Sequence, residues 1–155
     1  MQLTVKKLNQ FLFFKLPSAW LCGVRVKTIT KTDCSVGVKH RWINQNPFNS
    51  MYFAVQAMAA ELSTGALVMS KIKAEKQSIS MLVAQNKSVF NKKATGKIIF
   101  ECTDGEVINK AIRKTIETGE GQTFWMKSIG RNQDGLEVSV FEFQWTLKSK
   151  TRIAK

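Results

Sequence analysis

The feature that most constrains the fold is one long apolar stretch, Asn46 to Met69, which reads NPFNSMYFAVQAMAAELSTGALVM. It holds a single charged residue, Glu61, and small residues recur along it, so other backbone can approach closely from several directions. A helix that is apolar on nearly all sides is a buried helix rather than a surface helix. Asn49 or Ser50 can cap its start, because short polar side chains accept hydrogen bonds from the first free amides. We therefore predict one buried helix, from about Ser50 to Val68, which the rest of the chain surrounds.

This stretch does not predict a membrane span, because it is rich in Ala and a span needs roughly 20 strongly apolar residues. A second apolar segment near the N-terminus, LNQFLFF, follows two lysines and faintly resembles a signal peptide. Lys15 interrupts that segment, and no clear cleavage site follows it. We predict instead a short amphipathic helix from Leu3 to Lys15, in an N-terminal segment 1–17 that ends at Pro17. Binding of this helix to a membrane surface is the less favoured interpretation.

Elsewhere the apolar residues alternate with a period of two, which is typical of strands. The predicted strands are 24–29, 35–42, 78–90, 97–102, 122–129 and 136–147. We place Trp42 on the inward face of the second strand. We expect bulges near Asn86-Lys87 and between Val140 and Phe141, where the apolar face changes phase.

One further helix is predicted between the fourth and fifth strands, over Glu106–Thr118, with Gly119 just past its end. The tail, Lys148–Lys155, is basic. The whole chain, residues 1–155, therefore predicts a single α+β domain in which a curved, mostly antiparallel sheet wraps around one long central helix.

Charge and cysteine content restrict the partners and the compartment. The formal net charge is +13, from 24 Lys and Arg against 11 Asp and Glu. Such a balance favours nucleic acid, an anionic membrane or the phosphates of coenzyme A, or simply indicates a solvated basic surface. Three widely spaced cysteines, an odd number, fit a reduced cytoplasmic protein better than a disulfide framework. With one histidine, His40, and no CxxC motif, we expect no metal site.

This order of elements resembles the hot-dog fold, and the local sequence is similar to acyl-CoA thioesterases of the phenylacetate-pathway type. In that family an Asn before the central helix is followed by His-Gly at the helix start and by an acidic residue further along. Here Asn46 and Glu61 stand fifteen residues apart, and Glu61-Leu62-Ser63-Thr64-Gly65 is similar to the family's acidic residue and the small residues after it. The stretch Val89–Ile98 resembles the family's strand–turn–strand. The resemblance covers Val24–Leu147 and points to the divergent thioesterase-like branch of uncharacterised function.

The resemblance implies thioester hydrolysis, with Glu61 as general base or nucleophile, the helix-start amides stabilising the oxyanion, and Asn46 as a further residue of the catalytic site. Tyr52 and Phe53 stand where active relatives carry His-Gly; Phe53 keeps the backbone N–H but adds a large side chain. Glu61 lies roughly two and a half turns into the helix, so it cannot meet the start of its own helix. A homodimer, or a dimer of dimers, is therefore implied, in which Glu61 of one subunit faces Asn46 and the helix start of the other.

The expected substrate is an acyl-CoA, whose coenzyme A moiety is part of the substrate, so that no cofactor is expected. The residues expected to bind it are Met51, Tyr52, Val55 and Met58 for the acyl group and Lys92 and Lys93 for the phosphates. One alternative is a non-catalytic acyl-CoA-binding or scaffolding dimer of the same fold. Another, less favoured, is a nucleic-acid-binding module that stacks bases on Phe124, Trp125 and Trp145 between Lys127 and Lys148.

Overall fold

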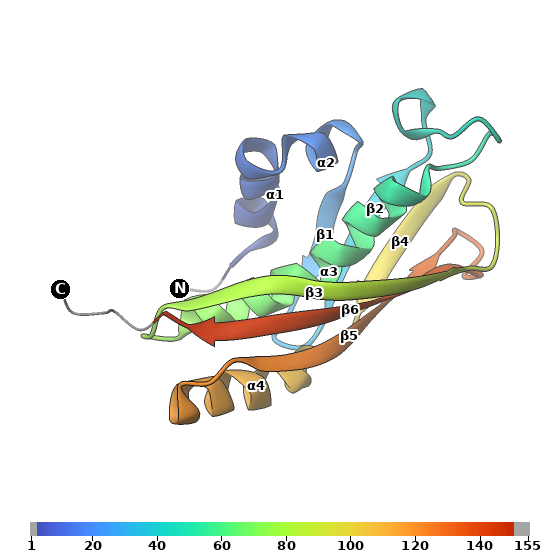
Figure 1. Ribbon diagram of the computed structural model, residues 1–155. Coiled ribbons are helices and arrows are strands. Elements are labelled where there is room, and N and C mark those ends of the chain that lie inside the picture. The colour runs from blue at the N-terminus through green and yellow to red at the C-terminus, as the bar shows by residue number, and fades with distance from the viewer. Residues whose placement is uncertain (1–2, 151–155) are drawn as a thin grey trace.

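The computed structural model describes residues 3–150, and within them a six-stranded sheet curves around one long helix (Figure 1). The elements, in chain order, are α1 (Val5–Lys15), α2 (Pro17–Leu21), β1 (Arg25–Ile29), β2 (Cys34–Lys39), η1 (Trp42–Asn44), α3 (Phe53–Ala74), β3 (Ile79–Phe90), β4 (Lys97–Cys102), α4 (Gly105–Thr118), β5 (Gln122–Arg131) and β6 (Glu137–Ser149). The strand order is β1-β2-β4-β5-β6-β3, and every neighbouring pair is antiparallel. The prediction of a hot-dog fold is confirmed.

The central helix α3 begins three residues later and ends six residues later than predicted. Neither expected cap is used: Tyr52 is the N-cap residue and its side chain makes no capping bond, while Asn49 has a left-handed φ of 57° in the preceding loop. At the other end, Lys71 and Lys73 occupy the last turn, where cations interact favourably with the helix dipole. Although α3 has the length and composition of a spanning helix, 61% of its apolar window is buried inside the fold, as in a core helix.

The N-terminal segment forms two helices rather than the single one predicted. Thr4 caps α1 by accepting a hydrogen bond from the backbone N of Lys7 at 3.3 Å. Pro17 ends α1 as expected but also begins α2, because a proline lacks the N–H that the first helical position leaves unpaired. Asn9 attaches α1 to the sheet by exchanging two hydrogen bonds of 3.0 Å with the backbone of Val26 in β1.

Trp42 is not in the core, and this prediction is wrong. The strand β2 ends at Lys39, because the Asn44 side chain draws the chain into the short turn η1. Asn44 Nδ2 donates to the carbonyl of Lys39 at 2.9 Å, and Asn44 Oδ1 accepts from the backbone N of Arg41 at 2.8 Å. As a result the Trp42 side chain is 84% exposed.

One predicted bulge is present but displaced, and the other is absent. In β3 the register shifts between Val83 and Gln85 rather than at Asn86-Lys87. In β6 no shift separates Val140 from Phe141, since consecutive pairing with β3 and β5 runs through both. The phase change was misleading because a polar residue, Ser139, takes the core-facing position; its hydroxyl donates to Oε1 of buried Gln56 at 2.8 Å.

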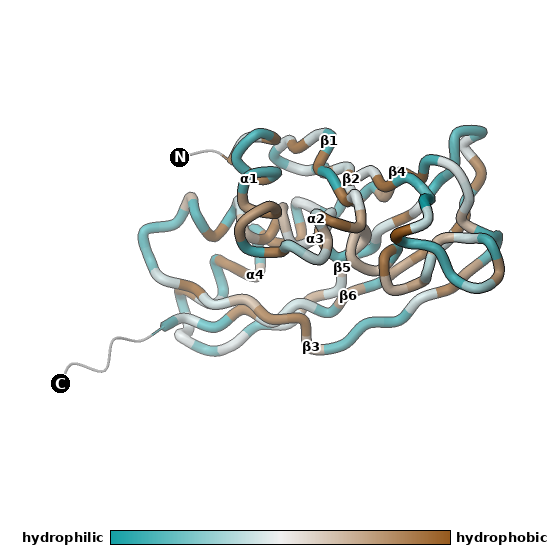
Figure 2. The backbone as a smooth tube through the Cα atoms, turned by 90° about the horizontal axis from the view of Figure 1, so that it is seen from above, coloured by the Kyte–Doolittle hydropathy of each residue, from teal (hydrophilic) through white to brown (hydrophobic). Residues whose placement is uncertain are grey.

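Strand β3 lies at one edge of the sheet, beside β6, and β1 lies at the opposite edge (Figure 2). The outer edge of β3 is therefore unpaired along twelve residues. Its exposed side chains include Leu82, Val89 and Phe90. A long, partly apolar free edge of this kind is a ready template for pairing with another strand.

Candidate active site

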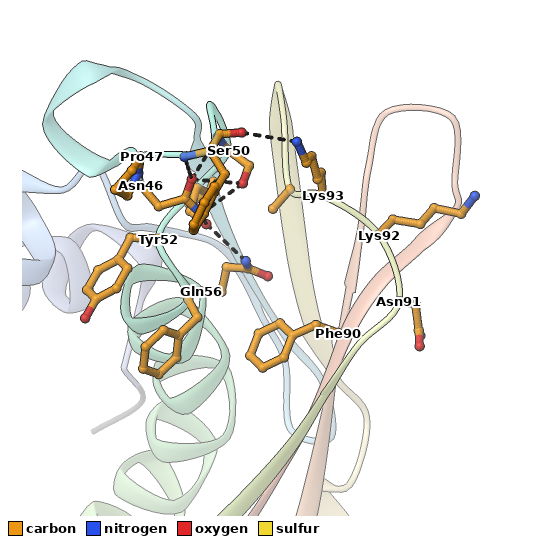
Figure 3. A pocket seen from close by; sticks show the side chains of 13 residues that line it. Asn46, Pro47, Ser50, Tyr52, Gln56, Phe90, Asn91, Lys92 and Lys93 are labelled. Carbon is orange, nitrogen blue, oxygen red and sulfur yellow. Dashed lines mark hydrogen bonds between the residues drawn. The ribbon is translucent and has the colours of Figure 1, made fainter.

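The structure distributes the sequence-predicted site residues over two separate pockets. One, of about 500 Å³, lies at the start of α3 and is lined by Asn46, Met51, Tyr52, Phe53, Lys92 and Lys93 among others. We call it the helix-start pocket (Figure 3). The other, of about 490 Å³, surrounds Glu61, and we call it the Glu61 cleft. No residue lines both pockets, so Glu61 and Asn46 do not meet within one chain.

Asn46 uses its side chain to shape the loop before α3. Its Oδ1 accepts hydrogen bonds from the backbone N of Phe48 at 2.9 Å and of Ser50 at 3.2 Å, and its Nδ2 donates to Ser50 Oγ at 2.9 Å (Figure 3). Met51 follows, almost fully buried, and its backbone N donates to the carbonyl of Ala94 at 2.8 Å. Asn46 therefore determines where the helix starts, and its polar atoms are already engaged.

The first turn of α3 leaves backbone donors unpaired beside the helix-start pocket, which Phe53 lines. The carbonyl of Tyr52 accepts from the backbone N of Val55 at 3.0 Å and of Gln56 at 3.3 Å. Within residues 3–150, the amides of Phe53 and Ala54 have no acceptor. The first amides of a helix are unpaired by geometry and lie at the positive end of the helix dipole, so they favour an anion.

Two aromatic side chains and two lysines frame these donors. The Tyr52 ring packs edge-on against Phe53 at 5.0 Å, and Phe53 contacts Phe90 of β3 at 6.2 Å between ring centroids. Lys93 donates from Nζ to the carbonyl of Phe48 at 3.2 Å, while Lys92 extends into solvent (Figure 3). The rim of the pocket is thus both aromatic and cationic.

Glu61 sits alone in an apolar cleft. The cleft is lined by side chains from α1, the α1–α2 junction, α3, β3 and β6: Phe11, Leu16, Leu62, Gly65, Ala66, Met69, Met81, Leu82, Val83 and Trp145. Among the described residues, the Glu61 carboxyl has neither an ion-pair nor a hydrogen-bond partner. Burial raises the pKa of this carboxyl to about 7, because the apolar surroundings disfavour the charged form.

Gly65 and Thr64, which the sequence placed only among the small residues after Glu61, shape the Glu61 cleft. A Cβ at Gly65 would lie 3.1 Å from Glu61 Oε1 and 3.1 Å from the Trp145 ring, so any larger residue would push the carboxyl or the ring aside by a few tenths of an ångström. Thr64 orients the ring, since its Oγ1 accepts from Trp145 Nε1 at 3.0 Å and donates to the carbonyl of Glu61 at 2.8 Å. The spacing of Gly65, four residues after Glu61, is the signal that could have revealed it.

The other two predicted acyl-binding residues lie outside both pockets. Val55 is buried in the core and Met58 is partly buried, and neither lines either pocket. Of the proposed base-stacking aromatics, Phe124 and Trp145 are buried, so they cannot form an exposed platform. In the described part of the chain, no three His, Cys, Asp or Glu residues gather where they could hold a metal ion.

A protein family described as "Domain of unknown function (DUF4442)" matches residues 5–147. The chain belongs to the DUF4442 family. No protein of curated function matches it.

Solved structures similar to this DUF4442 protein cover nearly its whole length. They include PA5026 of Pseudomonas aeruginosa, described as "Probable Thioesterase", at 21% identity, with 96% of this chain and 98% of that chain covered and a TM-score of 0.79. OLEI01261 of Chlorobaculum tepidum, of unknown function, has 15% identity, coverage of 95% and 98%, and a TM-score of 0.80. Thioesterase HI1161 of Haemophilus influenzae has 12% identity, coverage of 100% and 97%, and a TM-score of 0.74. The DUF4442 chain therefore shares its fold with proteins described as thioesterases, as the sequence resemblance predicted.

Proposed function

We propose that this protein is an acyl-CoA thioesterase whose active site forms between two subunits. The observation that carries the proposal is the unpartnered Glu61 carboxyl in an apolar cleft, with a pKa raised to about 7. A partly buried carboxyl without a partner is costly to the fold, and groups perturbed in this way cluster at functional sites. The descriptions of PA5026 and HI1161 as thioesterases support the same reaction class.

The proposed reaction uses Glu61 as a general base. The carboxylate takes a proton from water, and the water oxygen bonds to the thioester carbonyl carbon, whose oxygen becomes an anion. The free amides of Phe53 and Ala54 in the other subunit donate hydrogen bonds to that oxyanion. The carbon–sulfur bond then breaks, the thiolate takes the proton from Glu61, and a carboxylic acid and free coenzyme A leave. In a variant of this scheme Glu61 attacks the carbonyl directly, and water then hydrolyses the resulting anhydride.

Pairing of the two β3 edges would bring the two halves of this site together. Met81, Leu82 and Val83, near one end of β3, line the Glu61 cleft, and Phe90, at the other end, lines the helix-start pocket. An antiparallel pair with its twofold axis near Asn86 places Leu82 opposite Phe90 of the other subunit. Each Glu61 cleft would then adjoin the other subunit's helix-start pocket. The same pairing would cover the exposed apolar side chains of the edge.

The two pockets suggest how a substrate would lie. The apolar Glu61 cleft would take the acyl group, between Phe11 and Leu16 on one side and Met81 on the other. Lys92 and Lys93 at the other subunit's rim would bind coenzyme A phosphates as point charges.

The buried free thiols Cys34 and Cys102 fit the reducing cytoplasm, where we place the protein.

The experiment is thiol release from a panel of acyl-CoA substrates by wild-type protein and by Glu61→Gln. Because a positioned general base contributes on the order of 10²–10⁴-fold, we expect kcat to fall by at least a hundredfold in the variant. Glu75→Gln, at the end of the same helix, is the matched control. Absence of turnover in the wild type over the whole panel would overturn the enzymatic proposal.

One observation favours a second candidate, a non-catalytic acyl-CoA-binding protein. The Phe53 side chain, packed against Phe90, stands beside the proposed oxyanion donors, where it narrows the approach of a thioester. Titration with a non-hydrolysable acyl-CoA thioether separates the two candidates. Saturable binding without thioester turnover identifies the binding protein, and saturable binding with turnover identifies the enzyme.

A further inference from the structure

Three large apolar side chains outside both pockets are exposed on one side of the molecule. Phe14, near the end of α1, is 73% exposed; Leu21, the last residue of α2, is 66% exposed; and Trp42, the first residue of η1, is 84% exposed. Single exposed apolar residues are common on protein surfaces, but a contiguous group of large ones marks an interaction site.

The segments that carry these side chains contact one another. The Phe13 ring packs edge-on against Phe14 at 4.8 Å and against Trp20 of α2 at 5.3 Å. Asn44 Nδ2 donates to the carbonyl of Cys22 at 2.9 Å, which holds the turn η1 against the end of α2. In Figure 1, α1, α2 and the segment after β2 lie along the same upper side. We call this surface the aromatic ridge, made of Phe13, Phe14, Leu21 and Trp42.

Cationic side chains are interleaved with the aromatic ridge. Lys15 is exposed and directly follows Phe14, and the Arg25 guanidinium stacks 3.3 Å from the centre of the Trp20 ring. The Arg41 guanidinium covers Gly23, where a Cβ would lie 2.6 Å from Nη2. From Met1 to Tyr52 the chain carries eight Lys or Arg and a single acid, Asp33. The N-terminal third of the chain is therefore strongly basic, and Lys15 and Arg41 directly adjoin Phe14 and Trp42 of the ridge in the sequence.

We propose that the aromatic ridge docks the protein onto an anionic lipid bilayer. Aromatic and aliphatic side chains enter the headgroup–acyl boundary, while Lys and Arg extend to the anionic headgroups. Each basic residue near such a surface contributes on the order of 1 kcal/mol to attraction by anionic lipid. A second copy of this chain is a poorer fit, because the same positive charge would face itself across the contact.

The proposed docking adds a location to the proposed chemistry but does not depend on it. Phe11 of α1 and Leu16 of the α1–α2 junction line the Glu61 cleft, and Phe14 and Leu21 lie on the same two helices. A bilayer bound at the aromatic ridge would therefore lie next to the wall of that cleft. Membrane binding is measured without any turnover, so failure of the thioesterase proposal and failure of this one are distinguishable.

The test is flotation of the full-length protein with vesicles of phosphatidylcholine alone and with vesicles of equal parts phosphatidylcholine and phosphatidylglycerol. We expect binding to the anionic vesicles, with a blue shift of tryptophan fluorescence. Phe14→Ser/Leu21→Ser/Trp42→Ser should weaken that binding by on the order of tenfold or more, since three apolar side chains lose their burial in lipid. The matched control is Val107→Ser/Leu136→Ser, two exposed apolar residues on α4 and before β6, and it should bind like the wild type.

Several outcomes overturn the proposal. The proposal is wrong if the wild type does not associate with anionic vesicles at low salt. It is also wrong if the triple variant binds as well as the wild type, because the attraction would then come from general charge and not from the ridge. A triple variant that loses single-stranded RNA binding while the wild type ignores vesicles would identify a nucleic-acid surface. A change of the triple variant from dimer to monomer in sedimentation would show that a second copy covers the ridge. Thermal unfolding of the triple variant, measured alongside, excludes misfolding as the cause of any loss.

Discussion

Glu61 and Gly65 lie one turn apart on α3, and the space where a Gly65 Cβ would stand is occupied by Glu61 Oε1 on one side and the Trp145 ring on the other, each at 3.1 Å. That distance is tighter than ordinary contact, so a methyl group there displaces the carboxyl or the ring. Ala is also the better helix former, so a loss of activity would not reflect a weaker helix.

The first prediction is that Gly65→Ala lowers thioester hydrolysis at least tenfold while leaving the protein folded. The added methyl group displaces a neighbour by a few tenths of an ångström, and since a misplacement of about 1 Å at a catalytic group can cost on the order of 10²-fold in rate, we expect the smaller loss. Steady-state kinetics with circular dichroism checks this. Gly121→Ala, whose added Cβ would meet its first neighbour at a relaxed 3.5 Å, is the control and should keep its activity. Full activity in Gly65→Ala would show that the observed position of the Glu61 carboxyl, beside Gly65, is not the one from which it reacts.

A second prediction concerns the pH dependence of the rate. Because the pKa of Glu61 is raised to about 7 and the base must be ionised, kcat/KM should rise with pH up to about pH 7 and then level off. The test is kcat/KM measured from pH 5 to pH 9 with the acyl-CoA that the enzyme hydrolyses fastest. A plateau that begins near pH 4.5, the ordinary glutamate pKa, would mean that Glu61 titrates as an exposed carboxyl.

A third prediction is that the free energy of unfolding falls as pH rises, over the range in which kcat/KM rises. The folded pKa lies above the ordinary value of 4.5, so between about pH 4.5 and 7 the folded state holds a proton that the unfolded state has released. The free energy of unfolding therefore falls as pH rises through this window, by about 3 kcal/mol in all. Glu61→Gln should remove this fall, and urea unfolding at pH 4 and pH 8 of both proteins measures it. Parallel curves for the two proteins would contradict the prediction.

A fourth prediction tests the paired β3 edges. Val89→Lys places a charge on each exposed edge, opposite the apolar Val83 of the other subunit, so the variant should be monomeric and should hydrolyse thioesters at least a hundredfold more slowly. Sedimentation and kinetics on the same sample measure both effects. Val107→Lys, on α4, serves as the control and should stay dimeric and active. A monomeric but fully active Val89→Lys would place the whole site within one subunit.

Several elements could be predicted because their signals are local. The buried helix, the strands and the second helix are each encoded by periods of a few residues, and β4 was predicted with its observed bounds. Errors arose where a side chain bonds to a distant or irregular segment. Asn44 turns Trp42 out of its strand through bonds to Lys39 and to Cys22, and Ser139 occupies a core position because Gln56 accepts its hydrogen bond.

The candidate site, too, could be predicted from the sequence only in part. Glu61 could be singled out from the sequence alone, because one carboxyl in an apolar helix is conspicuous in any fold. Three other properties come from the tertiary structure. Glu61 has no partner, Gly65 and Trp145 enclose it, and the Asn46 side chain is bonded within its own loop. They depend on which strands lie beside α3, with β6 placed next to β3, and such long-range pairings leave no periodic trace in the chain.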